Sequence, residues 1–507
     1  MDSLTSHDTQ LPASRPRFSW SVLVPALGFL VYACLLAHYM GACAGGSDSS
    51  GYLNNARILA QGQVTLPMRL VPGLDPATMP AYTHVPLGFI PNRDHVTLIP
   101  TYPMGLSLLI MGAAQLVGWE CAPGLVMGLH ALIGLWLVFR LARGLGLEAG
   151  WAWLGVLLLA ASPLYLIMSL QAMSDIPALV WVTAAVWFAW SSQKRTWLAV
   201  AGGFALGIAV LVRPTNLLAV MPVALALGWS LRRWLLLILG GLPGAVFLGY
   251  FNLTAYGRIL TTGYGDVGGV FGRQYVPVTL MHYAIWMPMV LTPLCLLALG
   301  LPVLWRRQPR VSAILALWAL PFFVFYLFYL HTHEAWWYLR FLLPAFPALI
   351  VATMLVGRAL LNRLTTSWRP GWLVVAGIAV AVHGVAWCRH YYVHHAGFGE
   401  RVYPMTAAWL QAHLPANTVV ASMQTSGAML YHTRFTFFRW DMISPADFAR
   451  IAGACAAAGR PIYAVLFPYE IEDKNWAAFD KHLTGHWVQV GAVRQVSIWR
   501  YDTPAAP

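Results

Sequence analysis

The chain has 507 residues, of which 59% are hydrophobic and only 10% are charged. Soluble domains carry about 25% charged residues, so this composition argues against a soluble protein and predicts a polytopic membrane protein. The formal net charge of +13 does not indicate a nucleic-acid partner, because Lys and Arg lie in short clusters between apolar runs. Six cysteines without a C-x-x-C pair argue against a disulfide framework or a zinc knuckle.

A polar tail, residues 1–19, precedes a series of apolar runs and is predicted to be cytoplasmic. Each run predicts a helix, because the backbone must satisfy its own hydrogen bonds inside a bilayer. The first run has no clear cleavage site after it and is predicted to be an uncleaved helix. The runs are 20–42, 123–141, 151–170, 176–191, 197–212, 215–230, 234–251, 281–304, 311–330, 339–357 and 371–388.

Basic clusters orient these runs. With the N-terminus inside, eleven crossings place every cluster on the cytoplasmic side, as the positive-inside rule requires. An additional apolar run, Tyr102 to Trp119, would reverse this order if it crossed, so it is predicted to be an interfacial or re-entrant helix on the outer face. The clusters are Arg140 and Arg143; Lys194 and Arg195; Arg232 and Arg233; Arg306, Arg307 and Arg310; and Arg358, Arg363 and Arg369.

The chain divides into a transmembrane domain, residues 20–390, with a large extracytoplasmic loop at 43–101, and a C-terminal domain at 399–507. Alternating short strands and helices predict a small α/β fold there, outside the cytoplasm. No internal repeat is seen, which argues against a transporter. The predicted strands are Thr418 to Ala421, Tyr431 to Trp440, Pro461 to Phe467, Trp487 to Val490 and Gln495 to Arg500, and the helices are Tyr403 to Leu414, Ser444 to Ala458 and Glu470 to His482.

Two acids stand where the chain meets the outer face. Asp48 follows the first apolar run, and Asp175 begins another. An acid at a membrane boundary is costly and usually functional, so both are predicted to be catalytic. The alternative is helix capping, because Asp is a favoured residue at a helix start.

Arg213 and Arg340 lie on the same outer face, against the positive-inside trend. A guanidinium matches phosphate geometry, so both are predicted to bind a phosphate. The alternative is snorkelling to lipid headgroups. Around these residues, the predicted substrate-binding side chains are Tyr52, Arg93, Tyr102 and Tyr338.

No cofactor is predicted, and a divalent metal is the alternative. His331, His333 and Glu334 have metal-like spacing, but no further ligand stands at a set distance in the sequence. The motif is therefore not assigned as a metal site.

The motifs together resemble the GT-C glycosyltransferases, in the branch of the protein O-mannosyltransferases and aminoarabinose transferases. The resemblance covers residues 20–360 and rests on the order of short motifs. They are SDSSGY at 47–52, YPMGL at 102–106, MSDIPAL at 173–179, LVRPTN at 211–216 and YLRFLLPAFP at 338–347.

The resemblance implies a polytopic GT-C-like fold with about 11–13 transmembrane helices. It also implies an inverting enzyme of the bacterial inner membrane that uses a polyprenyl-phosphate-linked sugar, with Asp48 as general base and Arg213 and Arg340 as the residues that bind the donor phosphate. Protein mannosyltransferases carry Asp-Glu where this chain has Asp48-Ser49, so a lipid, a glycan and a protein all stay open as acceptors. The alternative functions are a transporter or flippase of lipid-linked saccharides and a non-catalytic subunit of an envelope assembly.

Overall fold

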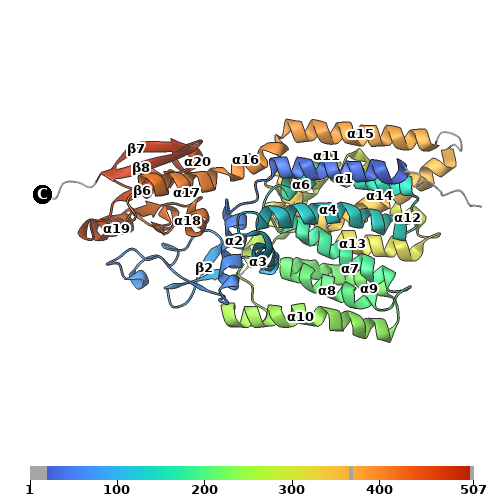
Figure 1. The fold of residues 1–507 in the computed structure, drawn as a ribbon, viewed down its shortest axis with the longest axis horizontal. Helices are drawn as coiled ribbons and strands as arrows, with labels where there is room; N and C mark the ends of the chain where they lie inside the picture. The colour runs from blue at the N-terminus through green and yellow to red at the C-terminus, as the bar shows by residue number, and fades with distance from the viewer. Residues whose placement is uncertain (1–19, 266, 365–368, 503–507) are drawn as a thin grey trace, which may run out of the picture.

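The protein is described by a computed structural model that covers residues 20–265, 267–364 and 369–502. The molecule is elongated, with a helical bundle at one end and a sheet-containing domain at the other (Figure 1). The segment that follows the first helix lies between them. The predicted cytoplasmic tail, residues 1–19, lies outside the described residues.

Each predicted apolar run coincides with a helix or a bent pair of helices. By length and composition, five helices of the described residues can cross a membrane, or up to seven if each bent pair is one span. Shorter apolar helices complete the bundle, and the chain is a multi-pass membrane protein. The bundle consists of α1 (Trp20–Tyr39), α4 (Ala122–Gly144), α5 (Ala149–Ala160), α6 (Pro163–Ser169), α7 (Asp175–Ser191), α8 (Leu198–Val212), α9 (Val220–Leu227), α10 (Leu231–Tyr256), α11 (Val276–Val290), α12 (Leu301–Leu304), α13 (Pro309–Leu327), α14 (Phe346–Leu364) and α15 (Arg369–His390).

The basic loops meet one another at one end of the bundle. Arg358 donates to the Gly146 carbonyl at 2.6 Å, and Arg310 donates to Gln193 Oε1 at 2.9 Å. Arg358 lies toward the C-terminal end of α14, which Figure 1 places far from the C-terminal domain. This grouping is the one that the charge pattern predicts.

The polar segment after α1 forms a layer across the end of the bundle. It contains α2 (Ser47–Ala60) and a small antiparallel sheet of β1 (Leu66–Pro67), β3 (Thr97–Pro100) and β2 (Phe89–Pro91). The next helix, α3 (Gly105–Val117), is seen nearly end-on in Figure 1, whereas α4, α8 and α10 run along the bundle. Its 13 residues and crosswise direction agree with the predicted interfacial helix.

The C-terminal domain contains a five-stranded mixed sheet in the order β5-β4-β6-β8-β7. Strands β5, β4 and β6 are parallel, and β8 and β7 continue the sheet antiparallel. This confirms a small α/β fold. Its elements are α16 (Ala396–Glu400), α17 (Val402–His413), β4 (Val419–Ala421), α18 (Ser426–His432), β5 (Thr436–Phe438), α19 (Pro445–Ala457), β6 (Ile462–Leu466), α20 (Pro468–Glu472), α21 (Ala478–Lys481), β7 (His486–Val493) and β8 (Val496–Asp502).

Two predictions inside this domain were wrong. The strand predicted over 431–440 is shorter, because α18 continues to His432 and only Thr436–Phe438 pairs. The helix predicted over 470–482 breaks into α20 and α21. The Asp473 side chain accepts a hydrogen bond from the Asn475 amide at 2.7 Å, a local turn that competes with helix.

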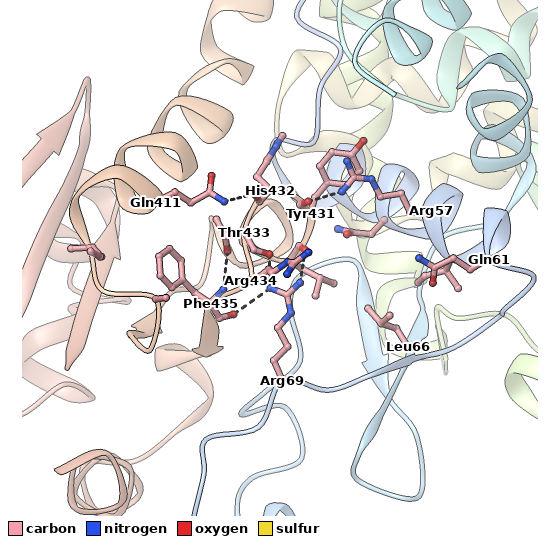
Figure 2. A pocket seen from close by; sticks show the side chains of 15 residues that line it. Arg57, Gln61, Leu66, Arg69, Gln411, Tyr431, His432, Thr433, Arg434 and Phe435 are labelled. Atoms are coloured by element: carbon pink, nitrogen blue, oxygen red, sulfur yellow. Dashed lines mark hydrogen bonds between the residues drawn. The ribbon is translucent and has the colours of Figure 1, made fainter. Parts of the chain in front are cut away.

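The polar segment after α1 and the C-terminal domain share hydrophobic cores. Ile58 and Phe89 pack in one cluster with Val420 and Val465 from the central strands. Guanidinium groups reinforce the contact (Figure 2): Arg69 donates to the carbonyl oxygens of Leu430, Thr433 and Phe435, and Arg57 donates to that of Tyr431. The bonds to Leu430, Tyr431 and Thr433 satisfy carbonyls that the end of α18 would otherwise leave unpaired.

Candidate active site

Asp48 lies in the first turn of α2 but does not cap this helix. The helix begins at Ser47, and its N-cap, Gly46, makes no side-chain cap hydrogen bond. The Asp48 carboxylate instead accepts a hydrogen bond from Arg340, with Nη2 2.8 Å from Oδ2. Arg340 comes from the 3-10 helix Trp336–Ala345 that leads into α14. The fold therefore joins residues that are 292 positions apart.

Asp175 is the first residue of α7 and lies behind this pair. Its Oδ1 is 2.8 Å from Nη2 of Arg213, and its Oδ2 is 3.9 Å from Nη1 of Arg340. The two predicted acids and the two predicted arginines thus form one network. Each guanidinium has only 12% of its side-chain surface exposed, and both are paired with carboxylates, so neither snorkels to lipid.

Several polar atoms of this network are buried without a hydrogen-bond partner. They are both carboxylate oxygens of Asp175, Nη1 of Arg213 and Nε of Arg340. The contacts of Asp175 are close ion pairs whose angles fall outside hydrogen-bond geometry. Buried polar groups without partners are costly and are rare except at functional sites, so the network has capacity left for a ligand.

Hydroxyl groups hold the network from the side of α2. Ser174 Oγ accepts hydrogen bonds from the Tyr52 hydroxyl and from Arg213 Nε, each at 2.9 Å. The Tyr52 ring lies 5.1 Å from that of Tyr102, whose hydroxyl is 2.8 Å from Ser47 Oγ. Tyr52 and Tyr102 therefore position the start of α2 against α7.

A cavity of about 410 Å³ opens in front of Asp48. Three predicted site residues line it: Asp48, Arg340 and Tyr338. The Arg340 guanidinium lies 5.6 Å from the centre of the Tyr338 ring. The complete lining is Gly46, Ser47, Asp48, Ser49, Ile167, Met168, Gln171, Met173, Trp337, Tyr338, Arg340 and Glu400.

The structure does not bring every predicted residue to this cavity. Asp175 is fully buried, and neither Asp175 nor Arg213 lines the cavity, so the predicted catalytic role of Asp175 stays a prediction. Arg93 is exposed in the turn between β2 and β3, and its backbone amide donates a hydrogen bond to Asn92 Oδ1.

Sequence reasoning missed Glu400, the last residue of α16. It lines the same cavity as Asp48, and its Oε2 accepts a hydrogen bond from Ser49 Oγ at 3.0 Å. The chain offered one signal: Glu400 is the sole acidic residue between Glu334 and Asp441. Its role was hidden because nothing in the sequence indicates that α16 returns to the start of α2.

The two carboxylates of the cavity have opposite electrostatic surroundings. Burial raises the pKa of Asp48, but the charge of Arg340 opposes it, and the resulting pKa lies below the ordinary value. Burial also raises the pKa of Glu400, to about 7, with only partial compensation by the Ser49 hydrogen bond. Asp48 is therefore ionised at neutral pH, whereas Glu400 is close to half-protonated.

The metal-like motif does not complete a site. His331 Nδ1 lies 2.8 Å from Glu334 Oε1, and both side chains are more than a third exposed. Within the described ranges, no three His, Cys, Asp or Glu side chains gather in a way that could hold a metal ion.

Comparisons with known proteins show which families and structures this chain resembles. Residues 101–252 match the family model described as dolichyl-phosphate-mannose-protein mannosyltransferase. This range contains Tyr102, Asp175 and Arg213 of the network. A search of curated protein sequences returns no match.

Solved structures resemble the whole chain. ArnT from Cupriavidus metallidurans bound to undecaprenyl phosphate matches at 14% identity and TM-score 0.56, over 95% of this chain and 98% of its own. The Archaeoglobus fulgidus oligosaccharyltransferase matches at 12% identity and TM-score 0.51, over 91% and 71%.

The mycobacterial arabinofuranosyltransferase AftD also matches, at 14% identity and TM-score 0.53, over 95% of this chain and 40% of its own. All three are GT-C glycosyltransferases, although their sequences are too distant for their substrates to be assigned to this chain. The chain therefore has the fold of the GT-C membrane glycosyltransferases.

Proposed function

We propose that this protein transfers a sugar from a polyprenyl-phosphate-linked donor to a hydroxyl of an extracytoplasmic acceptor, with inversion at the anomeric carbon. The observation that carries the proposal is the Asp48–Arg340 pair at the wall of a cavity. This pair supports the proposal because a carboxylate can act as a base and a guanidinium matches the geometry of a phosphate leaving group. The undecaprenyl phosphate of the ArnT structure supports the donor class.

The reaction is a single displacement. The acceptor oxygen bonds to the anomeric carbon as the bond from that carbon to the phosphate oxygen breaks, and the electron pair leaves on the polyprenyl phosphate. The acceptor hydroxyl gives its proton to a carboxylate of the cavity. Arg340 stabilises the charge that develops on the leaving phosphate, and Arg213 and Asp175 hold Arg340 in place. Attack opposite the leaving group inverts the centre.

Donor binding also activates the base. In the free protein, Arg340 lowers the pKa of Asp48, which makes Asp48 a weak base. A phosphate competes for the same guanidinium, so Arg340 binds Asp48 less tightly once the donor is present. The pKa of Asp48 then rises toward its ordinary value, and proton removal starts only in the loaded site.

The test compares Asp48→Asn with Asp94→Asn, using purified protein and a panel of polyprenyl-phosphate sugars. Asp94 belongs to the same polar segment, but it is exposed and only stabilises its own turn. We expect Asp48→Asn to lower turnover by about 100-fold or more, as loss of a general base does. Asp94→Asn should stay within about twofold of the wild type, the range of neutral surface changes. Equal turnover by Asp48→Asn and wild type would remove Asp48 from the base role.

The proposed location is the bacterial inner membrane, with the cavity and the C-terminal domain outside the cytoplasm. The basic loops at the opposite end of the bundle support this orientation.

A further inference from the structure

We propose that Glu400 is a second catalytic carboxylate and that it takes up the proton which the acceptor hydroxyl loses during transfer. This inference rests on the proposed function and adds a residue to it. Asp48 removes the proton as the acceptor oxygen bonds to the anomeric carbon, and the proton then passes from Asp48 to Glu400, which holds it until the product departs.

A hydrogen bond from α2 and the space left by a glycine position Glu400 at the cavity. Its carboxylate accepts from Ser49, the residue after Asp48, so the two acids are linked through adjacent residues of α2. Gly45 leaves the room: a Cβ at this position would lie 2.0 Å from Glu400 Oε2. A side chain at residue 45 would therefore displace the carboxylate from its position.

The segment around Glu400 is also anchored to the end of α1. The Cys43 thiol donates to the Glu400 carbonyl at 3.4 Å, and Arg401 donates to the Met40 carbonyl at 2.7 Å. Gly397 allows this close approach, because a Cβ there would lie 2.0 Å from the Tyr39 carbonyl oxygen. The backbone that carries the Glu400 side chain is thus fixed to the end of α1.

The chemistry of the cavity calls for two different acids. A carboxylate paired with Arg340 stays ionised and holds a proton poorly, whereas a buried carboxylate without a cation partner holds it well at neutral pH. Pairs of titratable groups with pKa values pushed apart mark separate proton-transfer roles. The charged and titratable groups around Glu400 are Asp48, Cys43, Arg401 and Tyr403, and none of them forms an ion pair with it.

The proton balance closes without an added reactant. The acceptor O–H bond breaks, its oxygen bonds to the anomeric carbon, the polyprenyl phosphate leaves with the electron pair, and the proton passes through Asp48 to Glu400. Glu400 releases the proton to water when the product departs and the cavity refills. The ionised form of Glu400 must be present at the start of each turnover.

The pH dependence of transfer provides the test. In the wild type, kcat/KM for the acceptor should rise about tenfold per pH unit up to about pH 7 and level off above it. Glu400→Gln should be about 100-fold slower on the plateau and should lose this limb, while its donor KM changes little. Glu400→Asp should restore part of the rate. A limb that persists in Glu400→Gln would overturn the proposal.

Two variants separate a catalytic role from a structural one. Ser49→Ala removes a hydrogen bond that lowers the pKa of Glu400, so its limb should shift to higher pH without disappearing. Glu470→Gln is the matched control, because burial raises the pKa of Glu470 to about 7 as well, but Glu470 lies in the C-terminal domain and does not line the cavity. The Glu470→Gln variant should keep the rise of kcat/KM up to about pH 7. Loss of this rise in Glu470→Gln would contradict the assignment of the proton acceptor to Glu400.

Asp48→Asn, measured in parallel, distinguishes this inference from the proposed function. If Asp48→Asn is slow at every pH while Glu400→Gln keeps the rise of kcat/KM up to about pH 7, only the role of Glu400 is refuted. Wild-type rates in Asp48→Asn would refute the base role of Asp48, and the absence of transfer by the wild type from every donor would overturn both.

Discussion

At the scale of single residues, the site depends on charges that the fold has removed from water. Asp48, Asp175, Arg213 and Arg340 neutralise one another in pairs, so that no single charge is buried alone. Removing one partner leaves the other uncompensated, which costs more than the pair itself contributes.

Arg340 carries the first prediction at this scale. Arg340→Ala removes the cation that pairs with Asp48 and that we propose binds the donor phosphate, so we expect donor KM to rise by about tenfold or more, the value of a charge-assisted hydrogen bond. Arg358→Ala, in the helix α14 that follows, is the control, because its partner Glu148 is exposed and lies 3.3 Å away. Arg358→Ala should change donor KM by less than about twofold. Similar effects of the two substitutions would argue against a phosphate role for Arg340.

Glu470 gives a prediction for stability. Burial raises its pKa in the folded protein to about 7, above the ordinary value of about 4.3. Between these pH values the folded protein keeps a proton that the unfolded chain has lost, so stability falls as pH rises. Glu470→Gln should weaken this fall in Tm, measured in detergent from about pH 5 to pH 7. The exposed neighbour Glu472→Gln should leave the slope unchanged.

At the scale of elements, the crosswise helix α3 positions one side of the site. Helix α3 packs against α2, α4 and α8. Gly105 begins α3 where a Cβ would lie 2.3 Å from the Val212 amide nitrogen, immediately before Arg213. The first turn of α3 therefore sets the place where α8 ends and where Arg213 leaves the helix.

Two glycines of α3 form a matched pair for a test of this role. Gly105→Ala should displace the end of α8, lower Tm and weaken polyprenyl-phosphate binding, because the clash involves backbone atoms that cannot rotate away. Gly112→Ala has nothing within 4 Å of the new methyl group and should hold or raise Tm, since Ala favours helix. Thermal scans and a binding titration of each variant decide the matter. Equal behaviour of the pair would show that α3 does not position Arg213.

At the scale of the whole molecule, the polar segment after α1 joins the membrane bundle to the C-terminal domain. The guanidinium of Arg69 contributes three hydrogen bonds to this junction. The Asp48 cavity lies nearby and takes Glu400 from the connection to that domain. The domain is thus tied to the site rather than appended to it.

The topology is testable by cysteine labelling. In a background without the six native cysteines, Ala149→Cys at the basic end of the bundle and Ala457→Cys in the C-terminal domain give two exposed positions. A membrane-impermeant maleimide applied to intact cells from the outside should label position 457 and leave position 149 unlabelled until the membrane is opened. Labelling of both positions in intact cells would mean that the span count is off by one.

The sequence determined the class of fold. Apolar runs located the helices, the basic clusters predicted how the loops group, and turn residues such as Ser444 located the elements of the C-terminal domain. It also singled out Asp48, Asp175, Arg213 and Arg340, because charged residues beside apolar runs are costly without a partner. These signals are local, and each can be recognised within a few residues.

Only the tertiary structure decided which of these residues line the cavity and which lie elsewhere. Asp48 and Arg340 face the cavity, Asp175 is buried behind them, and Arg93 is exposed elsewhere. Glu400 reaches the cavity because the backbone at Gly397 approaches that of Tyr39 closely and because Gly45 leaves space for its carboxylate, contacts between segments more than 350 residues apart. Such contacts depend on packing between distant segments, and no local pattern of charge or hydropathy specifies them.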